Sequence, residues 1–125
     1  DEFIYSTYLA PSAASAAGAA IDCIEAMEPE RESMSLLSVL FRKRLIDNGF
    51  SVSLGDSPIV SVSLGEADAA IRASRALEQA GLRVGAVRPP TVPEGTSRLR
   101  ISLKANLSET ELTRIVDTLA TEVRA

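Results

Sequence analysis

The sequence predicts an α+β domain in which helices cover a small, mainly antiparallel sheet of three or four strands. The chain has 125 residues, of which 46% are apolar and 24% charged, enough for the core of one domain. Short segments that alternate apolar and polar residues are interspersed with longer segments of helical apolar spacing. No internal repeat or low-complexity linker interrupts the chain. We therefore expect a single domain over 1–125, with a helical lead-in at 1–48 and a sheet portion at 49–125.

Two helices are predicted before the first strand. The first extends from Pro11 to about Met27, because proline suits the first helical position. Its many alanines indicate either high helix propensity or close packing against a larger partner. The second follows Pro29 and ends at Gly49, with one apolar face formed by positions 34, 37, 40, 41 and 45. This helix also carries three cations that we interpret as a solvated polar side rather than a binding patch: Arg42, Lys43 and Arg44.

The strands are predicted from alternation with a period of two. Phe50–Leu54 is a short strand, and Ile59–Leu64 alternates apolar residues with serines, as a half-buried strand does. A helix at Glu66–Ala80 and a strand at Leu82–Val87 follow. The last strand, Arg98–Leu103, places alternate residues on opposite faces. We expect one face to be apolar and the other polar: Leu99, Ile101 and Leu103 against Arg98, Arg100 and Ser102.

The final helix carries the clearest start signal in the chain. Ser108 and Glu111 have the spacing of a capping box. Leu107, just before this box, is placed to contact Leu112 in a hydrophobic staple. The helix then continues with an apolar stripe that we expect to be buried: Leu112, Ile115, Val116, Leu119 and Val123.

The composition excludes several classes of function. The chain has no His and a single cysteine, Cys23, which rules out a usual zinc site, an internal disulfide and His-dependent catalysis. A net charge of -4 gives no reason to expect nucleic acid or an anionic membrane as a partner. The most apolar stretch, 9–24, is too short and weakly apolar to span a bilayer, and no basic segment precedes it. We therefore expect a cytoplasmic protein.

Two arginines stand out beside a stiff loop. The loop Arg88–Gly95 contains three prolines, which restrict the backbone and either hold a ligand in place or lower the entropy of the unfolded chain. Behind it, Arg98 and Arg100 share one face of a strand. Such a face either binds a carboxylate through bidentate guanidinium contacts or carries charges for solubility. The only lysines, Lys43 and Lys104, have no apolar setting that would lower their pKa.

Two segments resemble a known enzyme family. The segment RPPTVPEGTSRLRISL, Arg88–Leu103, is similar to the C-terminal signature of the 8-amino-7-oxononanoate synthase branch of the α-oxoamine synthases. These are pyridoxal phosphate (PLP) enzymes of fold type I. The opening segment FIYST, Phe3–Thr7, resembles the family's segment after the cofactor lysine. Helix order and loop spacing also agree, so the resemblance covers essentially all 125 residues. It implies the C-terminal small domain of a homodimeric enzyme whose large PLP domain is not in this sequence.

The resemblance also implies an activity for the longer protein. That activity is a PLP-dependent acyl transfer in biotin biosynthesis, which condenses L-alanine with a pimeloyl thioester, with decarboxylation, to 8-amino-7-oxononanoate. By resemblance, Arg100 binds the substrate carboxylate, Thr91 lines the substrate site, and Ser6 and Thr7 lie near the cofactor phosphate. No catalytic residue falls in this chain, because the family's Schiff-base lysine lies upstream, so we expect the isolated chain to be inactive. Two alternatives stay open: a related synthase that uses glycine or another acyl-CoA, and a non-catalytic ligand-binding α+β module.

Overall fold

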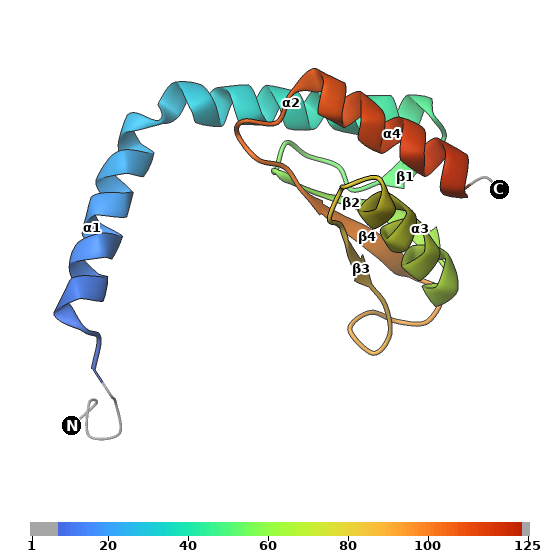
Figure 1. Ribbon diagram of the computed structural model, residues 1–125, viewed down its shortest axis with the longest axis horizontal. Helices are drawn as coiled ribbons and strands as arrows, with labels where there is room; N and C mark the ends of the chain where they lie inside the picture. The colour runs from blue at the N-terminus through green and yellow to red at the C-terminus, as the bar shows by residue number, and fades with distance from the viewer. Residues whose placement is uncertain (1–7, 124–125) are drawn as a thin grey trace. The chain divides into compact units, whose positions relative to one another are not determined.

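The computed structural model describes residues 8–123 of the chain. It divides the chain into two compact units, Asp1–Arg31 and Glu32–Ala125, and the second unit contains the sheet. The elements follow the predicted order (Figure 1). Their bounds are α1 (Pro11–Ala26), α2 (Glu28–Asp47), β1 (Ser51–Val52), β2 (Ile59–Gly65), α3 (Ala67–Gln79), β3 (Gly85–Val87), β4 (Ser97–Ser102) and α4 (Glu109–Val123).

Helix α1 is the main element of the first unit. It begins at Pro11 and ends at Ala26, as the sequence predicts. Every residue of α1 is exposed, including Ile21 and Ile24, whose exposed fractions are 57% and 51%. Within the described residues α1 buries no apolar stripe, and its many alanines have high helix propensity. In the stretch 8–123, no helix is both long and apolar enough to cross a membrane.

The sheet of the second unit is antiparallel throughout, which confirms the predicted fold class. Its strand order is β1-β2-β4-β3. Strand β3 is shorter than predicted, because the residues before Gly85 bond to helix α3 instead of pairing with a strand. Leu82 donates its backbone N–H to the carbonyl of Leu77 (2.8 Å), and the carbonyl of Val84 accepts a hydrogen bond from the Ser74 hydroxyl (2.6 Å).

The core lies between one face of this sheet and helices α2, α3 and α4 (Figure 1). The predicted alternation of β4 is confirmed, since Leu99 and Ile101 are buried and Arg100 and Ser102 are exposed. The helices contribute large, fully buried side chains: Phe41, Leu45, Leu77, Leu112 and Leu119. The opposite sheet face, here called the outer face, consists mostly of small and polar residues: Ser61, Ser63, Gly85, Arg98, Arg100 and Ser102.

Arg42 is the main departure from the sequence-based interpretation. It is only 5% exposed, so the assignment of this side chain to a solvated face is wrong, whereas Lys43 is exposed as expected. The Arg42 guanidinium donates to the carbonyls of Ser53 (2.8 Å) and Ile59 (3.0 Å) and to the Ser38 hydroxyl. Burial lowers the pKa of Arg42, and the Asp56 carboxylate opposes this shift. Arg42 therefore fastens α2 to the residue after β1 and to the first residue of β2.

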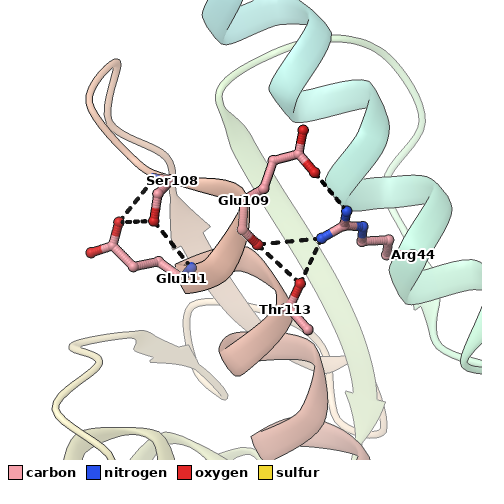
Figure 2. A network of polar contacts seen from close by, with 5 residues as sticks. All are labelled: Arg44, Ser108, Glu109, Glu111 and Thr113. Carbon is pink, nitrogen blue, oxygen red and sulfur yellow. Dashed lines mark hydrogen bonds and ion pairs between the residues drawn. The ribbon is translucent and has the colours of Figure 1, made fainter.

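A second polar network joins α2 to the start of α4 (Figure 2). The Arg44 guanidinium donates to the Glu109 carboxylate (2.9 Å) and to the Thr113 hydroxyl (2.7 Å). The predicted capping box is confirmed beside it, because Glu111 accepts from the N–H of Ser108 (2.8 Å) and donates its own N–H to the Ser108 hydroxyl (3.3 Å). The hydrogen bonds from Ser108 lower the pKa of Glu111. Leu107 packs against the core that contains Leu112, as a hydrophobic staple requires.

Candidate functional site

The outer face presents one arginine with a free guanidinium. Arg100 is exposed in the middle of β4, and within 8–123 its side chain makes no hydrogen bond or ion pair. Arg98, two residues earlier on the same face, is half-buried and donates from Nε to the carbonyl of Thr96 (3.1 Å). The two arginines that the strand period leaves equivalent therefore differ, and Arg100 is the one whose guanidinium is available to an anion among the described residues.

The neighbours of Arg100 on the adjacent strands are small. Ser61 of β2 pairs with Arg100 on one side, and Gly85 of β3 pairs with it on the other. Directly paired residues have side chains on the same face about 5 Å apart. Neither a serine nor a glycine is large enough to cover a guanidinium, so the arrangement leaves Arg100 accessible from the outer face.

An open cavity of about 660 Å³ lies beside Arg100. It is lined by Gly81–Gly85, by Arg100–Lys104, by Asn106 and Leu107, and by Glu111 and Ile115 of the first two turns of α4. Leu82 and Leu107 contribute apolar surface to it. Its cationic side chains, Arg83, Arg100 and Lys104, outnumber its one carboxylate, Glu111, which already bonds to Ser108. A cavity of this kind suits a ligand that combines an anionic group with an apolar part.

The proline-containing loop forms two successive turns next to β4. Thr91 donates its N–H to the carbonyl of Arg88 (3.0 Å), and Thr96 donates both its N–H (3.2 Å) and its hydroxyl (2.7 Å) to the carbonyl of Pro93. The peptide bond between Pro89 and Pro90 is cis. The Thr91 residue itself is exposed and is not among the residues that line the cavity beside Arg100.

Other candidate residues lie apart from this cavity or outside the described part of the chain. Ser6 and Thr7 precede residue 8, where the described residues begin. Lys43 and Cys23 are exposed on helices. Lys104 is also exposed, but it lines the cavity that contains Arg100. Across residues 8–123 there is no group of three His, Cys, Asp or Glu placed to hold a metal ion.

Sequence reasoning did not single out Ser61 and Gly85 as neighbours of Arg100. Their proximity depends on strand order and register, which the period of two alone does not fix. One signal was available, because a glycine inside a strand pattern often marks a close approach of another group. Gly85 falls inside the segment predicted as the strand Leu82–Val87.

Comparison with known proteins gives consistent similarities. The chain is 45% identical over 119 residues to 8-amino-7-oxononanoate synthase of Methylobacterium nodulans, covering 94% of this chain and 30% of that protein. The crystal structure of 8-amino-7-oxononanoate synthase from Francisella tularensis matches 98% of the chain and 36% of its own, with a TM-score of 0.85 and 27% identity.

A serine palmitoyltransferase from S. paucimobilis with bound PLP and myriocin matches 98% of the chain and 31% of its own. The TM-score is 0.86 and the identity is 27%. The chain thus spans about a third of the length of these proteins. Residues 1–119, nearly the whole sequence, match the protein family described as aminotransferase class I and II. The chain therefore belongs to the aminotransferase class I and II family.

Proposed function

We propose that this chain is the substrate-binding small domain of a longer PLP-dependent acyltransferase, a cytoplasmic homodimer. The reaction condenses L-alanine with a pimeloyl thioester, with loss of carbon dioxide, to form 8-amino-7-oxononanoate for biotin biosynthesis. The similarity to proteins named 8-amino-7-oxononanoate synthase supports this reaction. The structural observation that carries the proposal is the guanidinium of Arg100, which has no partner among residues 8–123 and is exposed on the outer face between Ser61 and Gly85.

The role we assign to Arg100 is to bind the carboxylate of the amino acid. A guanidinium can donate two parallel hydrogen bonds to a carboxylate, which fixes both the position and the plane of that group. The strand holds the backbone of Arg100 in place, with Ser61 and Gly85 paired on either side. A substrate bound in this way has one orientation of its α-carbon bonds, which lowers the entropy cost of the reaction. We also assign Thr91, in the turn after Arg88, to the edge of the substrate site.

The cofactor requirement divides the site between this chain and the rest of the longer protein. PLP supplies the electron sink for bond cleavage at the α-carbon of the amino acid. Lys43 and Lys104 are both exposed, and neither lies in an enclosed setting suited to covalent attachment of a cofactor. We therefore assign the attachment lysine to another part of the protein, and Ser6 and Thr7 to the surroundings of the cofactor phosphate. The isolated chain should be inactive.

The test uses the complete product of the gene that encodes this chain. Arg100→Ala removes the proposed carboxylate contact, and charged hydrogen bonds contribute about 1.5–3 kcal/mol. The KM for L-alanine should therefore rise about 10- to 150-fold, while the KM for the pimeloyl thioester stays nearly unchanged. Arg98→Ala is the matched control, since its Nε already bonds to the Thr96 carbonyl. Equal losses for both substrates, or equal effects of the two variants, would contradict the role of Arg100.

The same assay separates the related reactions. The likeness to serine palmitoyltransferase favours a second candidate, an α-oxoamine synthase that uses another amino acid or another acyl thioester. Comparing L-alanine, glycine and L-serine, each with pimeloyl and palmitoyl thioesters, identifies the preferred pair. A complete gene product that binds neither PLP nor any amino acid would instead indicate a non-catalytic binding module.

A further inference from the structure

Gly85 occupies a position where nothing in the backbone requires glycine. Five of the seven glycines have a positive φ, which L side chains rarely adopt: Gly49, Gly55, Gly65, Gly81 and Gly95. Gly85 does not share that conformation. A Cβ built on it would lie 3.9 Å from the Arg100 carbonyl oxygen, an ordinary van der Waals contact. An alanine would therefore fit the strand without strain.

A glycine at this position has a cost to the fold. Gly85 is the first residue of β3, which is an edge strand of the sheet. Strands favour β-branched and aromatic residues, while glycine lacks a side chain to pack and loses more conformational freedom on folding. Strand β3 is only three residues long, so one unfavourable residue is a large part of it. The benefit that offsets this cost should lie outside the backbone, on the face toward which a side chain at position 85 would point.

That face holds the guanidinium of Arg100. Gly85 is paired directly with Arg100 across the β3–β4 ladder, is itself exposed, and lines the cavity of about 660 Å³ together with it. A side chain at position 85 would lie about 5 Å from that of Arg100. It would contact the aliphatic part of Arg100 and occupy space that a carboxylate needs in order to approach the guanidinium.

We propose that Gly85 is a positioning residue whose missing side chain keeps the space beside Arg100 open to the carboxylate of an amino-acid substrate. The inference rests on the proposed function, because it takes Arg100 as the carboxylate-binding group. Beyond the proposed function, the inference names Gly85 as the residue that controls access to Arg100. It also states that access requires the absence of a side chain at position 85. Bulk at position 85 then lowers affinity for the amino acid in proportion to its size.

The experiment compares Gly85→Ala and Gly85→Val in the complete gene product. The KM for L-alanine should rise about threefold with Ala and about tenfold with Val. The kcat and the KM for the thioester should stay within about twofold. Thermal stability should equal or exceed that of the parent, since alanine and valine are better strand residues than glycine. As a binding readout, the upward Tm shift caused by saturating L-alanine should shrink in Gly85→Val.

Ser63→Val is the matched control. It adds bulk to the same outer face, but opposite Arg98 rather than Arg100, and should leave the KM for L-alanine unchanged. An unchanged KM in both Gly85 variants would overturn the inference, as would a lowered Tm with a parallel decline of every kinetic parameter. Arg100→Ala is measured alongside. If it leaves the KM for L-alanine unchanged, the proposed function itself fails; if it raises that KM while Gly85→Val does not, only the role of Gly85 fails.

Discussion

Removing the side chain of Arg42 should destabilise the fold more than any other single change of a charged residue in α2. The residue is almost completely buried, and its guanidinium satisfies the backbone carbonyls of Ser53, just after β1, and of Ile59, the first residue of β2. Arg42→Ala leaves the carbonyls of Ser53 and Ile59 without their charged donor. It also removes the hydrogen bond that the Ser38 hydroxyl accepts from Arg42. The same hydroxyl donates to the carbonyl of Ser57 (2.6 Å).

The size of the effect follows from these contacts. A hydrogen bond to a charged group contributes about 1.5–3 kcal/mol, so the two bonds to Ser53 and Ile59 amount to about 3–6 kcal/mol. The cost of burying the Arg42 guanidinium offsets part of this gain. We therefore expect Arg42→Ala to lower the free energy of unfolding by about 3 kcal/mol. The free energy of unfolding of Arg42→Lys should lie between those of the parent and Arg42→Ala, because an ammonium group keeps the charge but lacks the guanidinium fork.

Urea denaturation of the 125-residue chain, followed by circular dichroism, measures the difference. With an m-value of about 1–3 kcal/mol/M, the midpoint of Arg42→Ala should fall by about 1–3 M. Lys43→Ala, an exposed neighbour in α2, is the control and should leave the midpoint nearly unchanged. A similar midpoint for Arg42→Ala and the parent would refute the reasoning, and so would an equal loss in Lys43→Ala.

Two further predictions concern single polar groups. Ser97→Ala should leave the free energy of unfolding unchanged or raise it by up to about 1 kcal/mol, because the buried Ser97 hydroxyl has no hydrogen-bond partner in the described chain; a clear loss in urea denaturation would contradict this. Glu111→Gln should reduce the pH dependence of stability. The lowered pKa of Glu111 stabilises the fold above the unfolded value of about 4.3, and this contribution disappears as the pH falls through the folded pKa. Unfolding curves of both proteins at pH 7 and pH 3 test this, and identical pH dependence would count against it.

Most of the fold could be predicted because its signals are local. The alternation in β4 separates Leu99 from Arg100 within the strand itself, and the capping box of Ser108 and Glu111 spans only four positions. The ends of β3 could not be predicted in the same way. Leu82 is apolar enough for a strand, but its N–H bonds to the Leu77 carbonyl at the end of helix α3. Hydropathy does not show whether a backbone N–H bonds to a helix or to a neighbouring strand.

The burial of Arg42 and the difference between the two arginines required the structure. Ser38, Phe41, Arg42 and Leu45 share one side of α2 at helical spacing, so the position of Arg42 was a usable signal. The charge of Arg42 nevertheless favoured an exposed position. The carbonyls that compensate for its burial belong to residues 53 and 59, and the sequence does not show that these lie next to α2. Likewise, Arg98 and Arg100 are equivalent by strand period, and the structure adds that Arg98 is half-buried and bonds to the Thr96 carbonyl while Arg100 is exposed.

The two faces of the sheet should tolerate substitutions to different degrees. Exchanges on the buried face disturb close-packed side chains such as Val62 and Leu99. Exchanges among the exposed small residues of the outer face need no repacking, so we expect them to leave the scaffold intact.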